Sequence, residues 1–407
     1  MNFVPNLGQT ELIRRIKSWW KTLEKPMFVF SGGPGTGKTT TLKYVIEDLG
    51  ISLDDVIGIA YSGKAVNVIA GNGLPAETIH AFAYIPQLVK LKDEMGEYIV
   101  NSSGDYKYSL EFVLKERIDD NIKLIIIDEL SMVPDWMVND ILSFGIPVIG
   151  VGDKDQLPPV FGTCSYILRP DYELTEIMRQ EKDNPIIQFC QTVNHYGHLK
   201  YGTYGSSRIL RSIDLGDNLI KDYDMIICCK NQTRDRINNL IRKDIYGRKD
   251  YPEVGDKIIC RQNVKDRTDG RRYLTNGTIG WIDEILSPTY SSKKLCIDFV
   301  PDYDTNAIFP NVFMDTKYIQ LGYEERQDFG MSKYVKFEYG NLITAHLSQG
   351  SQYDRVLYLD EPFGSRELRK KIKYTAISRA AKSIDIVTIT PKSKIRIFGI
   401  KKYILFL

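Results

Sequence analysis

Cysteine, histidine and net charge are all scarce in this sequence. Its 407 residues include six cysteines and four histidines, and 54 basic residues nearly balance 52 acidic ones, which leaves a net charge of +2. The cysteines form no C-x-x-C pair, which suits isolated buried thiols in a reducing compartment. Because the net charge is close to zero, bulk charge gives no argument for binding a polyanion, and any nucleic-acid contact has to come from a local groove.

Long apolar runs and low-complexity linkers are also missing from the sequence. No stretch approaches the length of a membrane span, and residues 1–5 (MNFVP) lack the charged and apolar regions of a signal peptide. We therefore expect an intracellular protein with no membrane partner. The length and the hydrophobic content of 43% allow two to four domains with a substantial core.

The sequence does contain a phosphate-binding loop. Residues 31–40 (SGGPGTGKTT) fit G-x-x-x-x-G-K-[ST], and they lie between an apolar run that predicts a buried strand and an apolar spacing that predicts a helix. Loop N–H groups and the helix dipole converge on an anion in such a unit, while Lys38 reaches the terminal phosphates and Thr39 ligates Mg²⁺. A glycine-rich turn without a ligand would not need Lys followed by Thr. The residues expected to bind the nucleotide here are Gly33, Pro34, Gly35, Thr36, Gly37, Lys38, Thr39 and Thr40.

Two carboxylates follow a second apolar run. Residues 124–127 (LIII) predict a central buried strand, and Asp128 and Glu129 stand at its end. Asp128 can hold Mg²⁺ through water and Glu129 can orient and deprotonate the attacking water, which are the tasks that P-loop hydrolysis gives to acids. An exposed turn pair is the alternative. Gln156 follows the predicted strand 146–151 and is placed to sense the γ-phosphate.

The α/β pattern begins again after residue 180. Residues 224–229, 355–360 and 384–389 predict three further strands, but no glycine-rich loop accompanies them. We therefore expect a second lobe that closes over the nucleotide of the first lobe rather than binding another one. Two stretches lack the apolar periodicity of the lobes: 85–112, which predicts a hairpin, and 284–343, which predicts a small β insert.

Two short runs, residues 265–272 and 366–373, are locally basic. A run of this kind, taken alone, is more often a solvated face than a binding surface. From the sequence we therefore assign neither run to a partner.

A series of motifs in this order resembles superfamily 1 helicases, and within them the 5′-to-3′ (1B) branch of Dda-like and RecD-like helicases. The resemblance covers nearly the whole chain, and it implies an α/β fold of two tandem RecA-like P-loop NTPase lobes. It places lobe 1A at 1–84 and 113–180, a pin insert 1B at 85–112, lobe 2A at 181–283 and 344–407, and an SH3-like β insert 2B at 284–343. The motifs are GGPGTGKTT (32–40), AYSGKAV (60–66), TIHAFAY (78–84), IIIDELSM (125–132), VGDKDQLPPV (151–160), LTEIMRQ (174–180), NGTIG (276–280), TAHLSQGSQYD (344–354) and YTAISRA (374–380).

The same resemblance assigns nucleotide contacts outside the loop. Gln9 resembles the glutamine that reads the adenine edge, and a glutamine amide has the donor and the acceptor that this needs. Gln349 with Gly350 resembles a nucleotide contact from the second lobe. Arg179 and Arg379 resemble two arginine fingers, which stabilise charge on the transferring phosphoryl group and make hydrolysis sensitive to closure of the cleft.

The resemblance further implies a groove for single-stranded DNA. Hydroxyls and Lys64 suit phosphate contacts, and Phe82 suits stacking on a base, with Tyr84 or Tyr98 as alternative stacking residues. The residues assigned to the groove are Ser62, Lys64, Thr78, His80, Phe82, Asn276, Thr344 and His346.

The implied activity is ATP- and Mg²⁺-dependent 5′-to-3′ translocation on single-stranded DNA with unwinding of duplex. The implied partners are single-stranded DNA, duplex junctions and single-stranded-DNA-binding or replication proteins, in the cytoplasm of a bacterial or phage-infected cell. Three alternatives stay open: an RNA-directed motor, a motor of 3′-to-5′ polarity, and a nucleotide-gated clamp that does not unwind. The sequence does not distinguish replication, recombination and repair as the pathway.

Overall fold

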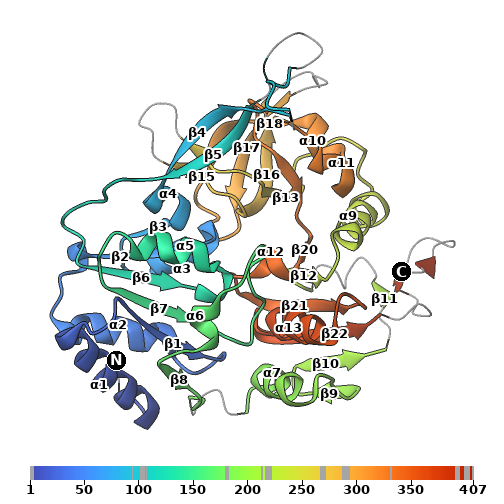
Figure 1. Cartoon of the computed structure of the whole chain (residues 1–407). Coiled ribbons are helices and arrows are strands. Elements are labelled where there is room, and N and C mark those ends of the chain that lie inside the picture. The colour runs from blue at the N-terminus through green and yellow to red at the C-terminus, as the bar shows by residue number, and fades with distance from the viewer. Residues whose placement is uncertain are drawn as a thin grey trace.

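Two mainly parallel sheets, each covered by helices, form two lobes, and two further β elements lie above them in Figure 1. Among the residues that the structure describes, no helix has the length and apolarity that a membrane span requires. The computed structural model describes residues 4–93, 95–100, 106, 108–178, 183–211, 214–215, 222–265, 272–286, 294–330, 332–389, 395–397 and 404–405.

The first lobe is built on a six-stranded sheet in which every pairing is parallel. Its central strands are continuous apolar runs because helices cover both faces. The strand order is β3 (Ala76–Thr78), β2 (Val56–Ala60), β6 (Leu124–Asp128), β7 (Val148–Gly152), β1 (Met27–Gly32) and β8 (Tyr172–Leu174). One face packs on α1 (Leu7–Thr22), α2 (Lys38–Leu49) and α3 (Gly63–Gly71), and the other on α4 (Ile79–Ala83), α5 (Asp135–Leu142) and α6 (Ser165–Leu168). Short helical turns are η1 (Leu53–Asp55) and η2 (Leu130–Met132).

The second lobe has a six-stranded sheet that is parallel except where β9 pairs with β10. The strand order is β20 (Leu342–Thr344), β12 (Met225–Cys228), β21 (Tyr353–Asp360), β22 (Ala380–Thr388), β10 (Ser207–Leu210) and β9 (Gly202–Tyr204). One face packs on α7 (Pro185–Tyr196) and α13 (Arg366–Ile377), the other on α9 (Asn231–Leu240) and η4 (Ile241–Ile245), and α12 (Ala345–Ser348) follows β20. A small separate sheet contains β11 (Asp214–Leu215), β23 (Ile395–Ile397) and β24 (Ile404–Leu405). The α/β fold with two lobes that the sequence predicts is thus confirmed.

An antiparallel hairpin interrupts the first lobe, as the sequence predicts. It consists of β4 (Tyr84–Lys90) and β5 (Tyr108–Leu114), so its pairing starts one residue before and ends two residues after the expected range 85–112. The hairpin exposes apolar side chains such as Ile85, Leu88 and Phe112.

A five-stranded antiparallel sheet interrupts the second lobe. Its expected start at residue 284 falls inside β16. The sheet begins earlier in the sequence, because the apolar run 258–260 pairs with residues 337–339 and not with the parallel sheet. We therefore propose 257–339 as the range of this insert. The sheet order is β18 (Phe309–Asp315), β17 (Lys294–Pro301), β16 (Ile279–Ile285), β13 (Lys257–Cys260) and β19 (Phe337–Tyr339). Beside it lie α10 (Thr316–Gln320), α11 (Tyr323–Gln327) and the pair β14 (Val264–Lys265) and β15 (Arg272–Leu274).

Candidate functional site

The glycine-rich loop joins β1 to α2 in a tight turn. Gly35 and Gly37 have φ angles of +75° and +76°, a left-handed conformation that favours glycine. A Cβ atom on Gly37 would also lie 2.5 Å from the side-chain nitrogen of Gln9, so a larger residue would clash there. The Lys38 ammonium donates to the carbonyl of Gly32 at 2.7 Å, so the cation already sits over the loop. The loop thus has the tight, lysine-bearing turn that a triphosphate would need, and its role as the phosphate site stays a prediction.

Gln9 is a buried residue whose side chain is hydrogen-bonded to this loop. Its side-chain oxygen accepts from the Asn6 N–H at 3.0 Å, and its side-chain nitrogen donates to the Thr36 carbonyl at 3.2 Å. Both ends of the amide are therefore used by the protein, and Gln9 is fully buried. The adenine contact predicted for Gln9 stays a prediction, and in this structure the residue fixes the position of the loop.

The carboxylates Asp128 and Glu129 lie at the end of β6. Glu129 adopts φ +49°, unusual for a residue with a side chain, and its N–H donates to the Asp128 carboxylate at 2.8 Å. Burial, together with the charge of Glu129, raises the pKa of Asp128 to about 6, while Lys38 opposes the shift. Thr39 presents an exposed hydroxyl in the first turn of α2. A hydroxyl and a carboxylate are the oxygen ligands that Mg²⁺ prefers, so the residues present fit this ion.

We expect the substitution Asp128→Asn to stabilise the metal-free protein above about pH 6. The carboxyl has a usual pKa of 3.8 and a folded pKa of about 6, so the folded state loses stability as pH rises through that interval. Asparagine keeps the oxygen that accepts from Glu129 but carries no charge. Thermal unfolding without Mg²⁺ should therefore give a higher Tm for the variant at pH 7.5 and equal Tm values near pH 4. A variant less stable at pH 7.5 would contradict the burial argument.

Arg379 brings positive charge from the second lobe to these carboxylates. Its guanidinium lies 3.6 Å from the Glu129 carboxylate and is almost completely buried. The Ser351 carbonyl and the Ser378 hydroxyl accept from it at 3.2 and 3.0 Å, which fixes its direction. One ion pair therefore spans the cleft between the lobes, from the first residue after β6 to the residue before β22.

Tyr374 reaches the first lobe from α13. Its hydroxyl donates to the Asp153 carboxylate at 2.8 Å, and a Cβ atom on Gly33 would lie 3.2 Å from the same hydroxyl. Burial raises the pKa of Asp153, against the opposing charge of Lys38. The neighbouring Gln156 is buried, and its side-chain oxygen has no hydrogen-bond partner among the described residues. Gln156 therefore keeps an unused acceptor atom, while its side-chain nitrogen donates to the Asp153 carboxylate at 3.5 Å.

Leu157 anchors the first lobe in the second. Its side chain is completely buried in the hydrophobic cluster between the second sheet and helices α7 and α13. Its N–H donates to the Thr375 hydroxyl at 2.9 Å, and its carbonyl accepts from the Gln349 amide at 3.1 Å. Lys371 also donates to the Lys154 carbonyl at 2.9 Å. Gln349, predicted to contact nucleotide, thus holds the backbone that follows Gln156.

We expect Leu157→Ala to weaken the contact between the lobes. Truncating a fully buried leucine costs about 2–5 kcal/mol, and here the loss falls on an inter-lobe contact. Dyes placed on the two lobes should report a wider distance distribution, and thermal unfolding should broaden. Val160 in the same loop is 67% exposed, so Val160→Ala serves as the control and should change neither readout. Equal behaviour of the two variants would contradict the anchoring role.

Three residues assigned to the nucleic-acid groove cap helices. The hydroxyls of Ser62, Thr78 and Thr344 accept N–H groups in the first turns of α3, α4 and α12. Gly350 has φ +71°, and a Cβ atom there would lie 2.9 Å from the Ser62 hydroxyl, so the second lobe touches the start of α3. Burial lowers the pKa of His346, which favours its neutral form.

Asn276, also assigned to the nucleic-acid groove, lies in the insert of the second lobe, between β15 and β16. It is exposed, and its N–H donates to the Asn263 side chain at 2.9 Å. The preceding Thr275 approaches α3 so closely that a Cβ atom on Gly63 would lie 2.5 Å from its hydroxyl. The chain segment that contains Asn276 therefore adjoins the helix that Ser62 caps.

The stacking role predicted for Phe82 is wrong for this structure. Phe82 is 4% exposed and packs on Phe144 in the core of the first lobe, because α4 turns this residue toward the sheet. Tyr84 is equally buried and donates to Asp140. His80 remains near the surface, with its ring against those of Tyr61 and Phe112, both of which are exposed. Tyr98, the other predicted alternative, is half exposed.

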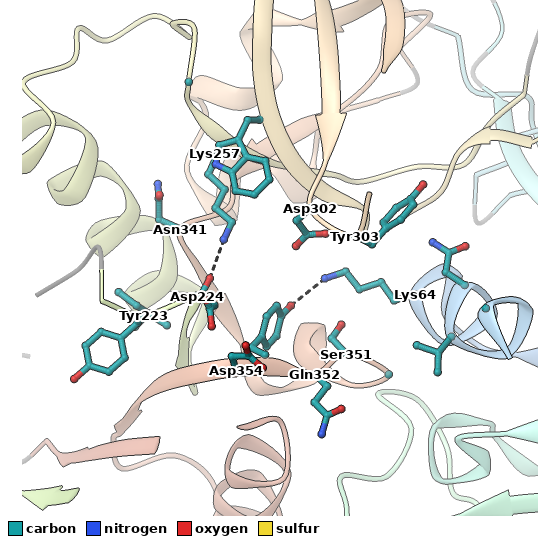
Figure 2. Close-up of a pocket in the computed structure, with 18 of the residues that line it drawn as sticks. Lys64, Tyr223, Asp224, Lys257, Asp302, Tyr303, Asn341, Ser351, Gln352 and Asp354 are labelled. Atoms are coloured by element: carbon teal, nitrogen blue, oxygen red, sulfur yellow. Dashed lines mark hydrogen bonds between the residues drawn. The ribbon is translucent and has the colours of Figure 1, made fainter. Parts of the chain in front are cut away.

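Lys64 lines a cavity of about 970 Å³ where the two lobes and the five-stranded sheet meet. Figure 2 shows Lys64 extending from α3 toward Asp302, and its ammonium donates to the Tyr353 hydroxyl at 3.0 Å. On the opposite side of the cavity, Lys257 donates to the Asp224 carbonyl at 2.8 Å. Lys64 is thus held by a residue of the second lobe. Arg179, the other predicted arginine finger, lies outside the described residues.

These two lobes and the glycine-rich loop define a P-loop NTPase with two RecA-like lobes. A family model described as an AAA domain matches residues 6–202. The chain is 33% identical over 381 residues to the ATP-dependent RecD2 DNA helicase of Deinococcus radiodurans, which covers 87% of this chain and 46% of that protein. It is 27% identical over 271 residues to the ATP-dependent DNA helicase dda of Enterobacteria phage T4, covering 59% and 57% of the two chains. The chain spans about half the length of these curated relatives.

Solved structures with the same fold include Pif1 helicases. A structure concerned with DNA unwinding at forked duplex by two Pif1 helicases has a TM-score of 0.57 and 18% identity, covering 94% of this chain and 92% of that one. Pif1 helicase from Bacteroides in complex with ADP-AlF3 and single-stranded DNA has a TM-score of 0.53 and 19% identity, covering 93% and 92%. The two relatives confirm the resemblance to RecD-like and Dda-like helicases that the sequence indicates, and the Pif1 structures show the shared fold.

Proposed function

We propose that this protein is an ATP-dependent DNA helicase that moves 5′ to 3′ on single-stranded DNA and separates the duplex ahead of it. The observation that carries the proposal is the ion pair across the cleft between Arg379 and Glu129, 3.6 Å long. It places positive charge from one lobe beside the acid of the other, as hydrolysis coupled to lobe closure requires. The relatives named as ATP-dependent DNA helicases support the substrate and the ATP dependence, and the direction rests on the motif resemblance.

The residues of the cleft divide the work of hydrolysis. Lys38 and the loop N–H groups bind the β- and γ-phosphates, and Glu129 takes a proton from the attacking water. Gln156 accepts a hydrogen bond from that water through its unpartnered oxygen. Arg379 stabilises the charge that develops on the γ-phosphoryl group. Thr39 and Asp128 would hold Mg²⁺, which would neutralise negative charge on the phosphates.

Lobe closure links this chemistry to the nucleic acid. The segment from Thr344 to Tyr353 includes Gln349, which holds the Leu157 backbone, and Tyr353, which holds Lys64. Movement of this segment on hydrolysis therefore changes contacts on both the nucleotide side and the strand side. The hairpin β4–β5, with its exposed apolar side chains, is the proposed pin that splits the duplex.

We expect Glu129→Gln to bind ATP normally but to hydrolyse it about 10² to 10⁴ times more slowly, which is the usual contribution of a general base. Glutamine keeps the size of the side chain and loses the proton acceptor. Steady-state ATPase rates with saturating single-stranded DNA measure the effect, and binding of a fluorescent ATP analogue is the control. Unimpaired turnover would remove Glu129 from the role of base.

A tailed-duplex assay tests the proposed function. Duplexes with a 5′ tail, a 3′ tail or no tail, made of DNA or RNA, are incubated with protein, ATP and Mg²⁺. We expect unwinding of the 5′-tailed DNA alone. Unwinding of 3′-tailed or RNA duplexes would favour the reverse-polarity or RNA-directed motor, and tight strand binding without multiple-turnover ATP hydrolysis would favour the clamp.

A further inference from the structure

A second cavity, of about 410 Å³, lies in the second lobe. It is bounded by the end of α7 and the turn after it, by the first half of α13, and by the sheet. Asp360 and Thr388, the last residues of β21 and β22, line it. In open parallel sheets ligands bind beyond the carboxyl ends of the strands, so this is a position where a ligand is expected.

Cationic side chains dominate the wall formed by α13. Arg366, Arg369, Lys370 and Lys373 line the cavity at helical spacing, against the acids Asp360 and Glu367. Lys373 is buried and its ammonium lies 2.8 Å from Asp360, so these two charges neutralise each other. No ion pair joins Arg366 or Lys370 to an acid within the described part of the chain. The cavity therefore keeps an excess of positive charge.

Arg369 is incompletely paired in the same wall. Its Nε atom lies 3.7 Å from the Asp360 carboxylate, which is too far for a hydrogen bond, and this buried atom has no hydrogen-bond partner among the described residues. The Arg369 side chain as a whole is 36% exposed, so the outer N–H groups of its guanidinium can meet an anion in the cavity. The opposite wall carries the aromatic side chains Tyr196, His198 and Tyr201.

We propose that this cavity is a binding site for a phosphoryl group, separate from the nucleotide cleft. Arginine and lysine side chains at helical spacing match the oxygens of a phosphate, and the volume is that of a small-molecule site. From the sequence alone, the basic run 366–373 is expected to be a solvated face. Under this proposal, the side of that run that lines the cavity binds an anion. Two sources share this chemistry: a free nucleotide or phosphate, and the backbone of a nucleic-acid strand.

The site and the nucleotide cleft use opposite sides of α13. Lys371, Tyr374 and Thr375 contact the first lobe, whereas Arg366, Arg369 and Lys370 face the cavity. An anion held by the second set would not touch the P-loop. Its binding would nevertheless fix the helix that leads to Arg379.

Calorimetric titration of the whole protein with inorganic pyrophosphate tests the proposal. Lys38→Ala removes the P-loop lysine, and we expect this variant still to bind one equivalent of pyrophosphate. Adding Arg366→Gln and Lys370→Gln should weaken that binding at least tenfold. Lys21→Gln with Lys317→Gln makes the same change of charge at exposed positions elsewhere and should leave it unchanged. Arg369→Gln in the Lys38→Ala background provides a second, independent loss of affinity.

Competition then identifies the source of the phosphoryl group. Displacement of pyrophosphate by ADP supports a free nucleotide, and displacement by a short thymidine oligonucleotide supports a strand. The proposal is overturned if Lys38→Ala binds no pyrophosphate, if the Arg366 and Lys370 variants bind it as tightly as their parent, or if a glutamate peptide binds at the cavity and pyrophosphate does not. Circular dichroism confirms that each variant is folded. Because hydrolysis is not measured, these outcomes are independent of the proposed helicase activity.

Discussion

Replacing Arg379 with alanine should slow DNA-stimulated ATP hydrolysis by a factor of about 10³ or more, the range that arginine fingers contribute. The guanidinium lies 3.6 Å from Glu129 and is directed by the Ser351 carbonyl and the Ser378 hydroxyl. It is a donor in a nearly dry cleft, where charge stabilisation is strong. Steady-state rates at saturating ATP and single-stranded DNA measure the loss.

The control for this prediction is Lys382→Ala, three residues further along the chain. Lys382 is exposed and pairs with Asp354, so its loss should change the rate by less than about twofold. Affinity for an ATP analogue should fall little in Arg379→Ala, because the loop and Lys38 belong to the other lobe. A rate within tenfold of the unchanged protein would show that Arg379 does not act on the phosphoryl group.

Replacing Lys38 with alanine should abolish hydrolysis, with a loss comparable to that of Arg379→Ala, while the fold is retained. The Lys38 ammonium is the cation held over the loop by the Gly32 carbonyl, and it opposes the upward pKa shifts of Asp128 and Asp153. Without it, the terminal phosphates face these buried acids with no compensating charge from the loop lysine. Rapid chemical-quench measurement of phosphate release detects the loss.

Lys43→Ala provides the matched control for the P-loop variant. Lys43 lies on the exposed face of α2, one turn beyond the loop, and should leave hydrolysis unchanged. Lys38→Ala should remain folded with a modestly lower melting temperature, because within the described residues its hydrogen bonds go to loop carbonyls and its charge offsets those of Asp128 and Asp153. Substantial DNA-stimulated ATPase activity in Lys38→Ala would contradict the assignment of the loop as the catalytic phosphate site.

The sequence predicts those parts of the molecule whose signals are local. The P-loop, the acids after β6 and the parallel strands each combine a short apolar run with residues that have a defined chemical task, and all lie where the patterns place them. The limits of the five-stranded sheet could not be read in this way. Residues 258–260 are apolar enough for either sheet, and only pairing with residues 337–339 decides between them.

Contacts between the lobes were the part that sequence reasoning missed. Leu157 and Tyr374 stand inside recognised motifs, yet nothing in the spacing says that a leucine of one lobe fills the core of the other. A clue was available, since an apolar residue between Gln156 and two prolines in a loop needs a place to be buried. The stacking role predicted for Phe82 was wrong for a different reason. An aromatic residue within a motif can either pack in the core or stack on a base, and the direction of α4 turns Phe82 into the core.

A structure of the protein with single-stranded DNA and ADP–aluminium fluoride, a mimic of the transferring phosphoryl group, tests the central claim most directly. The account predicts that one fluoride-bearing group contacts Lys38 from the first lobe and Arg379 from the second, with Gln156 and Glu129 on its attacking water. A bound mimic that contacts the first lobe alone, with Arg379 still paired to Glu129 and directed away from it, would contradict a triphosphate pocket built by both lobes.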